Sequence, residues 1–292
     1  MSENDAYYAQ ATKRNLGLVT AAEQDILKQK RVAVAGLGGV GGGHLLTLTR
    51  MGIGGFNIAD IDDFGTVNMN RQAGANSRTV GRAKTEVMAE MARDIHPGLS
   101  INIYNDGVQP HNAEEFLHDV DAVVDAIDFF QMDARRLLYR TARQLGKPVV
   151  FSAPIGFSGT LHVFTPNGPS FDDYYDINDQ MSRFEQLVAF TVGLVPRGTH
   201  WAYMDTNKVD LSEHAGPSIA SACNIANGLL TTEIFCLLLD RRAPDAVPYY
   251  VQFDPYRHLY RRGKLRWGNR GPLQKLKRWF VSQKFADQAD RV

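Results

Sequence analysis

The sequence predicts an α/β fold, in which a mostly parallel sheet carries helices on both faces and is extended by antiparallel strands in the C-terminal half. Two patterns lead to this prediction. Short apolar, β-branched runs alternate with segments of helical periodicity through about the first half of the 292 residues, and this alternation is typical of parallel sheets. Later, the run APIGFSGTLHVFTP has the alternation and the glycines of a bent or paired strand.

The elements of the first half follow one another in a regular order. The first predicted strand, 31–36 (RVAVAG), leads directly into glycines and then into a helix at 40–51. Further strands are predicted at 55–60, 100–104 and 122–127, and further helices at 81–95 and 113–118. This order predicts a Rossmann-like domain over residues 31–165, preceded by a helical arm at 1–30.

Residues 166–255 are expected to complete the same fold. A helix at 134–145 and a strand at 148–152 lead into the paired strand, and a long buried helix at 217–239 precedes a last strand at 249–253. Between them, residues 168–216 have few periodic signals, many aromatic residues and an acidic patch, so we expect a long crossover loop there. Loops of that length inside a compact domain are more often functional or mobile than inert.

The composition is that of an intracellular globular protein. The two cysteines, Cys223 and Cys236, are too few for a disulfide framework, and no CxxC pair is present to hold zinc. The N-terminus lacks the charge and apolar run of a signal peptide, and we find no uninterrupted apolar stretch near the roughly 20 residues of a membrane span. The expected location is therefore the cytoplasm.

The formal net charge of zero conceals an uneven distribution of charge. Nine basic residues and no acidic ones lie between Arg257 and Arg278, within a predicted basic C-terminal tail at 256–292. A solvated surface is the simpler interpretation, but such a tail can also hold an anionic partner such as tRNA.

A glycine motif follows the first strand. Gly36, Gly38, Gly39 and Gly41 satisfy GxGxxG between a predicted strand and a predicted helix, so backbone N–H groups and the helix N-terminus can face a phosphate. Asp60, at the end of the second strand, is placed to bind a ribose hydroxyl of NAD or of ATP. The motif therefore predicts nucleotide binding without choosing the nucleotide.

Polar and charged side chains beyond the second strand favour ATP. A phosphate chain that is being cleaved needs cations beside it, for which a hydride-transfer enzyme has no obvious use. Lys84 lies in the first turn of its predicted helix, where the helix dipole disfavours a cation unless a polyphosphate is bound; the alternative is that Lys84 simply reaches into solvent. The set comprises Asp60, Asp62, Asn68, Asn70, Arg71, Gln72, Lys84 and Asp128.

Asp128 follows a predicted central strand, at the sheet edge where open parallel sheets bind ligands. A carboxylate that faces phosphates needs a metal between them, and Mg²⁺ is the simplest choice. Capping of the following helix is an alternative role for the same side chain.

Five motifs occur in order: GLGGVG at 36–41, DID at 60–62, NMNRQ at 68–72, VGRAK at 80–84 and DAID at 125–128. With this series the sequence closely resembles the MoeB/ThiF/HesA family of ubiquitin-activating-type adenylyltransferases, and the resemblance covers about residues 14–165. The segment 217–239 also resembles the late helix of that family. Five ordered motifs are a far more specific signal than the glycine loop by itself.

The resemblance implies an enzyme that binds ATP and Mg²⁺ and activates a carboxylate as an acyl-adenylate with release of pyrophosphate. Carried over to this sequence, Asp60 would hold the ribose, Asn68, Arg71 and Lys84 the phosphates, and Asp128 the magnesium. The implied substrate is the C-terminus or a side chain of a small protein or peptide. Family members are typically homodimers in which an N-terminal arginine reaches the partner's site, and Arg14 is the best candidate for it.

The sequence departs from the family pattern at two places. Where many relatives carry the first of two CxxC pairs, it reads Phe171-Asp-Asp-Tyr174, so zinc is not expected. No cysteine lies between about 165 and 215, and Cys223 and Cys236 fall on a predicted buried helix, so adenylation without a protein thioester is favoured.

Three alternatives stay open. The NxNRQ segment and the missing zinc also resemble the dehydratases that cyclise a threonylcarbamoyl group on tRNA, which use the same adenylation. An NAD-dependent oxidoreductase would use the glycine loop without Lys84. A degenerate nucleotide-binding scaffold is the non-enzymatic alternative, although no core site residue is missing.

Overall fold

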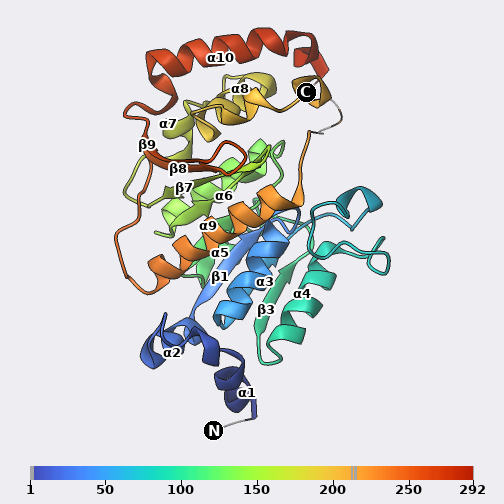
Figure 1. Ribbon diagram of the computed structural model, residues 1–292, viewed down its shortest axis with the longest axis vertical. Helices are drawn as coiled ribbons and strands as arrows, with labels where there is room; N and C mark the ends of the chain where they lie inside the picture. Colours follow the sequence, from blue (N-terminus) through green and yellow to red (C-terminus); the bar gives the residue numbers. More distant parts are fainter. Residues whose placement is uncertain (1–2, 212, 214–215, 292) are drawn as a thin grey trace.

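The computed structural model describes residues 3–211, 213 and 216–291, and this part of the chain forms one nine-stranded mixed sheet with helices around it (Figure 1). The strand order is β3-β2-β1-β4-β5-β7-β8-β9, and β6 pairs with β7 off this path. The predicted fold class is thus confirmed.

The parallel half contains five strands whose order reverses at β1 and β4. These strands are β1 (Arg31–Ala35), β2 (Gly55–Ala59), β3 (Ser100–Tyr104), β4 (Ala122–Asp125) and β5 (Val149–Phe151). In register, Val32 lies beside Phe56 of β2 on one side and Ala122 of β4 on the other. Such a switch point opens a crevice at the carboxyl ends of the strands, so the fold itself places a ligand site beyond Ala35 and Asp125.

The antiparallel half begins where β5 pairs with β7. Its strands are β6 (Pro154–Ile155), β7 (Ser158–Phe164), β8 (Tyr249–Asp254) and β9 (Leu259–Lys264). The hairpin of β6 and β7 is the paired strand that the sequence predicts, whereas β9 lies within the segment predicted as a tail.

Helices cover both faces of the sheet because side chains alternate along the strands. Val32 and Val34 pack with α3, α4 and α9, which lie side by side over one face (Figure 1), and Ala33 and Ala35 pack with α5 and α6 on the other. The helices are α1 (Glu3–Ala11), α2 (Ala21–Gln29), α3 (Gly41–Met51), α4 (Lys84–Ile95), α5 (Ala113–His118), α6 (Met132–Gln144), α7 (Phe171–Tyr175), α8 (Arg183–Leu194), α9 (Ala220–Leu238) and α10 (Pro272–Lys284). Short 3-10 helices are η1 (Lys13–Asn15), η2 (Thr66–Asn68), η3 (Thr199–Ala202), η4 (Thr206–Lys208), η5 (Gly268–Arg270) and η6 (Ala286–Arg291).

The segment 168–216 is not the long loop that the sequence predicts. It contains α7, α8 and two 3-10 helices. Nine of the twelve residues of α8 are buried, on all sides of the helix. A helix that is apolar all round has no amphipathic period, which explains why the sequence pattern does not reveal it.

The basic C-terminal segment is also folded. Helix α10 lies over α8 (Figure 1), where Gln274 Nε2 donates to the Val192 carbonyl at 3.1 Å and Lys277 Nζ to the Pro196 carbonyl at 2.6 Å. The packed side chains are Gln274 and Val281. Leu273, Leu276 and Phe280 of α10 are exposed.

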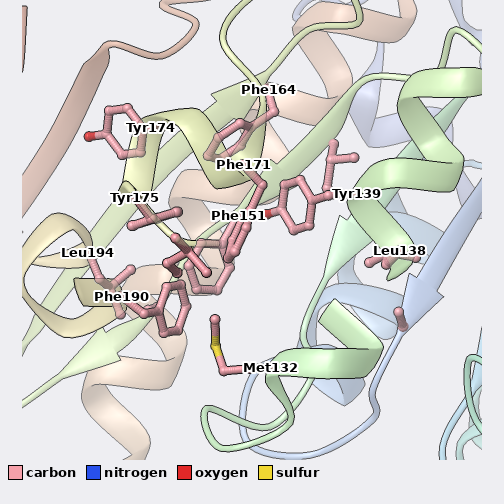
Figure 2. Packing of buried hydrophobic residues seen from close by; sticks show 14 of the residues in the cluster. Met132, Leu138, Tyr139, Phe151, Phe164, Phe171, Tyr174, Tyr175, Phe190 and Leu194 are labelled. Atoms are coloured by element: carbon pink, nitrogen blue, oxygen red, sulfur yellow. The ribbon is translucent and has the colours of Figure 1, made fainter. Parts of the chain in front are cut away.

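Aromatic side chains fill the core beneath α7 and α8. Tyr139 of α6, Phe164 of β7 and Phe171 of α7 converge with their rings 4.5–6.0 Å apart, and Phe151 stacks on Phe190 at 5.7 Å (Figure 2). Pairs of this geometry stabilise a core beyond the area that they bury. The Phe171–Tyr174 segment, where relatives would place a CxxC pair, is therefore an anchor for the aromatic core.

Helix α9 is the one helix in the described residues that has the length and apolar composition of a membrane span. It packs on β7 and α3 and contributes Leu230 and Ile234 to the core. The predicted buried helix at 217–239 is thus confirmed as a core element.

Buried histidines make the stability of this fold dependent on pH. Burial lowers the pKa of His162 in β7 from 6.5 to about 3, opposed by the backbone of Gly193, and lowers the pKa of His44 and His200 to about 4. Because the folded pKa is the lower one, the stabilisation is complete above pH 6.5 and is lost as the pH falls toward 3.

His162→Phe should therefore flatten this pH dependence, since phenylalanine suits a site between Tyr174 and Tyr250. Relative to the variant, the wild type should lose about 1.4 kcal/mol per pH unit below 6.5, or roughly 2 kcal/mol by pH 5. Urea unfolding at pH 7.5, 6 and 5 measures the difference. The exposed His111, changed to glutamine, is the control, and parallel curves for wild type and His162→Phe would refute the prediction.

Candidate active site

The glycine loop connects β1 to α3 at the crevice of the sheet. Gly36 has φ +92°, which favours glycine, and a Cβ added there would overlap the carbonyl oxygen of Ala126 after β4. A Cβ on Gly41 would overlap the carbonyl oxygen of Gly36. These two glycines are therefore required for the close packing of β1, β4 and α3.

Gly38 and Gly39 lie on the open side of the loop. A Cβ on Gly38 would meet only Gln72 Nε2, at 3.7 Å, and one on Gly39 would have Cys223 Sγ as its nearest neighbour, at 3.4 Å. No side chain caps the N-terminus of α3, which begins at Gly41. Free N–H groups and the positive end of a helix dipole make such an opening an anion site, so the loop suits a phosphate chain.

Asp60 faces this loop from the end of β2. Its Oδ2 accepts from Leu37 N–H at 2.5 Å and its Oδ1 from Asp62 N–H at 2.9 Å. Burial raises the pKa of Asp60, whereas nearby Lys84 acts to lower it. The carboxylate is thus held against the glycine loop, at the position that the fold uses for a ribose hydroxyl.

Lys84 is the first residue of α4, and its side chain is only 6% exposed, so it does not reach into solvent. Its Nζ donates to Asp62 Oδ2 at 2.7 Å and lies 3.9 Å from Asp60 Oδ1. These carboxylates offset the cost of a cation at a helix N-terminus, a role that the sequence alone assigns to a bound polyphosphate. Lys84 therefore belongs to a preformed charge cluster beside the loop.

The segment after η2 lies across the glycine loop. Asn68 Oδ1 accepts from Gly65 N–H at 2.9 Å, and Arg71 donates to Asn70 Oδ1 at 2.8 Å. Gln72 is buried, and its Oε1 has no hydrogen-bond partner among the described residues. An unpartnered buried oxygen next to an open loop is typical of a ligand site.

Asn70 differs from the other residues of this set because it does not line the cavity. Its Nδ2 donates to the Ser218 carbonyl at 2.9 Å, and its Oδ1 holds Arg71. Asn70 thus connects the Arg71 segment to the chain that leads into α9, and direct contact of Asn70 with a nucleotide stays a prediction.

Asp128 lies three residues beyond the end of β4, which stops at Asp125 instead of 127. It is exposed in the crevice, and its Oδ1 accepts from Phe130 N–H at 2.9 Å. This bond fixes the turn before α6, but the N-cap of α6 is Gln131 and has no side-chain capping bond. The alternative role of Asp128 as a helix cap is therefore wrong, and its exposed carboxylate is available at the sheet edge.

Arg135 of α6 is a residue that the sequence analysis missed. It is 1% exposed; its Nε donates to Asp125 Oδ2 at 2.9 Å, and its terminal nitrogens donate to the carbonyls of Ile127 and Asp128. Arg135 therefore positions the turn that carries Asp128. The sequence did offer a signal for this pair: an Asp at the end of a buried strand is followed, ten residues later, by an Arg on the next helix.

One cavity of about 670 Å³ joins these groups. Its lining includes ten of the predicted site residues: Gly36, Gly38, Gly39, Asp60, Asp62, Asn68, Arg71, Gln72, Lys84 and Asp128. Ligand pockets in proteins are typically about 300–1,000 Å³. The predicted phosphate-side residues, far apart in sequence, are thus brought to one site.

Arg14 is not brought to this site. It lies exposed in η1, within the arm of α1 and α2. That arm packs at the amino ends of the strands, where Gly54 N–H donates to the Leu27 carbonyl, opposite the glycine loop (Figure 1). Within one chain Arg14 therefore cannot act on the nucleotide, and action in a partner's site stays a prediction.

Cys223 of α9 lies buried beside Gly39, and burial raises the pKa of its thiol. A raised pKa disfavours the thiolate that a nucleophile needs. Within the described ranges, no group of three or more His, Cys, Asp and Glu side chains could hold a metal by itself. Any Mg²⁺ here would take its remaining ligands from phosphate and water.

Comparisons with known proteins show what this chain is similar to. The chain is 40% identical over 114 residues to the tRNA threonylcarbamoyladenosine dehydratase of Haemophilus influenzae, covering 39% of this chain and 44% of the relative. It is 34% identical over 154 residues to the adenylyltransferase and sulfurtransferase UBA4 of Candida glabrata, covering 52% and 35%. The chain thus spans less than half the length of these curated relatives.

Solved structures share the fold. PaaA superposes with a TM-score of 0.67 at 19% identity, over 91% of this chain and 84% of PaaA. E. coli MccB, in a structure with ATP, superposes with a TM-score of 0.62 at 16% identity, over 83% of this chain and 65% of MccB. The model of the ThiF family matches residues 11–270, and the chain belongs to the ThiF family.

Proposed function

We propose that this protein binds ATP with Mg²⁺ and adenylates a carboxylate. The observation that carries the proposal is the open glycine loop at Gly38 and Gly39, with Asp60 on one side and the cations Arg71 and Lys84 beside it, in one cavity. A relative named an adenylyltransferase and a structure of MccB with ATP support this assignment.

In the proposed reaction a substrate carboxylate oxygen forms a bond to the α-phosphorus of ATP. The bond from that phosphorus to the bridging oxygen of pyrophosphate breaks, and pyrophosphate leaves with the electron pair. The loop N–H groups, Arg71 and Lys84 would stabilise the negative charge that grows on the phosphate oxygens. No electrons are gained or lost, so the reaction needs no redox partner.

Asp128 would hold the magnesium ion. A single exposed carboxylate beside a phosphate site fits Mg²⁺, which usually binds through one or two carboxylates together with phosphates and water. When bound, the ion would neutralise phosphate charge, and Arg135 would keep the turn of Asp128 in place.

The acceptor and the assembly are proposals as well. A structure of MccB with MccA and the relationship to UBA4 support a small protein or peptide as the carboxylate substrate. Arg14 would complete the site in a homodimer, reaching the nucleotide of the second subunit. Because the reaction consumes ATP, the proposed location is the cytoplasm.

The second candidate is the same adenylation in a tRNA threonylcarbamoyladenosine dehydratase, favoured by 40% identity over 114 residues. The C-terminal cations give it less support than the sequence suggested. Arg262, Arg270 and Arg278 form ion pairs with Asp245, Asp173 and Asp176 of the same chain, so part of this charge is neutralised. tRNA binding that weakens steeply with salt would favour the dehydratase. The ThiF family assignment gives no support to an NAD-dependent oxidoreductase.

Lys84→Ala should weaken ATP binding about tenfold or more, which is about 1.4 kcal/mol. The substitution leaves the carboxylates of Asp60 and Asp62 unpaired beside the phosphates. Calorimetric titration of ATP with Mg²⁺ measures the effect. Arg82→Ala is the matched control, because Arg82 pairs with Glu86 and Glu90 outside the cavity; equal affinities in the two variants would contradict the assignment of Lys84.

Asp128→Asn should remove the contribution of magnesium while leaving the turn intact, since an amide oxygen can still accept from Phe130 N–H. The wild type is expected to bind ATP about tenfold more tightly with Mg²⁺ than with EDTA. The variant is expected to bind ATP with the same affinity under the two conditions. ATP titrations under the two conditions provide the comparison, and an undiminished magnesium effect in the variant would exclude Asp128 as the ligand.

Substitutions of two loop glycines should affect ATP binding and folding differently. Gly38→Ala has room for its methyl group, so its melting temperature should stay within about 2 °C of the wild type, yet the methyl group should block the approach of phosphate and weaken ATP binding. Gly36→Ala should cost about 3 kcal/mol or more, or prevent folding. Thermal melts and ATP titration test both; normal ATP affinity in Gly38→Ala would mean that the phosphates bind elsewhere.

A further inference from the structure

The active-site cavity extends well beyond the nucleotide residues, into an apolar region enclosed by C-terminal elements. We call this region the apolar annex and define it by Leu187 and Leu194 of α8, Trp201 and Met204 at η3, Leu211, and Phe285 after α10. The first four lie on or beside α8 and η3, and none is needed to hold ATP. A bound nucleotide would therefore leave the annex free for another part of the substrate.

The strand order places the annex on the acyl side of the nucleotide. The glycine loop follows β1, and Asp60, Ile61 and Val108, which also line the cavity, lie toward β2 and β3. The annex lies in the opposite direction, past Asp128 toward Phe151 of β5. A nucleotide with its ribose at Asp60 would therefore present its α-phosphate toward Asp128, and the attacking carboxylate would come from the annex.

The chemistry of the annex wall selects against charged substrate groups. The charged side chain on this side of the cavity lining is Arg135, which is committed to Asp125 and to backbone carbonyls and lies over the ring of Phe190 at 4.7 Å. Among the described lining residues of the annex, a second carboxylate or a free ammonium group would therefore have no oppositely charged partner, and burial of an unpaired charge is unfavourable.

One polar group in the annex wall is available for a neutral partner. His200 lines the cavity, is 4% exposed, and has no hydrogen-bond partner for Nδ1 among the described residues. A neutral imidazole suits an amide N–H or a carbonyl of a ligand, depending on its tautomer. The annex is thus largely apolar, and the unpartnered Nδ1 of His200 gives it a buried site for an amide.

On the basis of the proposed adenylation, we infer that the activated carboxylate belongs to a bulky apolar residue whose amino group is blocked, as in a peptide C-terminus that ends in a residue such as Phe or Leu. The side chain fills the annex, the amide faces His200, and the carboxylate reaches the α-phosphate. This substrate class differs from a tail of small residues, which would leave the annex empty.

Titration of N-acetylated amino acids into the wild type with a non-hydrolysable ATP analogue and Mg²⁺ tests the inference. N-acetylphenylalanine or N-acetylleucine should bind at least about tenfold tighter than N-acetylglycine, because the side chain is buried in the annex. Free phenylalanine should bind more weakly than its acetylated form, since its ammonium group has no partner there.

Filling the annex provides the matched test. Met204→Trp should weaken N-acetylphenylalanine binding about tenfold or more and leave N-acetylglycine unchanged, and Val209→Phe, also on the cavity wall, is a second variant should the first fail to fold. Leu276→Trp, at a position 60% exposed on α10, is the control and should change neither.

The outcomes separate the two proposals. If the analogue of ATP does not bind to the wild type, the proposed function is wrong. If it binds, but N-acetylphenylalanine binds no tighter than N-acetylglycine, or Met204→Trp and Val209→Phe fold and have no effect, the substrate assignment is wrong and the adenylation proposal stands.

Discussion

The buried guanidinium of Arg135 is the interaction on which the active-site edge of this protein depends. It pairs with Asp125 at the end of β4, binds the carbonyls of the following turn, and lies 5.5 and 4.7 Å from the rings of Phe151 and Phe190. Loss of one member of a buried ion pair generally costs about 3–5 kcal/mol, because the other charge is left unpaired. One side chain thus joins the aromatic core to the turn that presents Asp128.

The sheet could be predicted from sequence wherever one physical signal dominated. Apolar β-branched runs identified β1 to β5, and the helices with one polar face were found with them. Helix α8 was missed because it is buried on all sides, so its sequence contains no helical period. The segment 256–292 was predicted as a basic tail, and its packing through Gln274 and Lys277 of α10 depends on tertiary contacts that the sequence does not reveal.

The phosphate side of the site was predictable because its residues lie in short motifs at the ends of elements. Gly36, Asp60 and Lys84 meet in one cavity because the carboxyl ends of parallel strands share one edge of the sheet, and the alternation of strands and helices in the sequence did predict a parallel sheet. The pairing of Lys84 with Asp62 needed the structure, since it depends on how α4 approaches the end of β2. The role of Arg135 and the apolar annex also needed it, because both depend on tertiary contacts between α6, α8 and η3.

The two halves of the cavity come from parts of the chain that are made at different times. The glycine loop, Asp60 and Lys84 belong to the first strands and helices, whereas Val281 and Phe285 in the opposite wall follow almost the entire fold. During synthesis on the ribosome the C-terminal part of the cavity wall is therefore made last. The cavity is therefore enclosed by both walls only after α10 has been made.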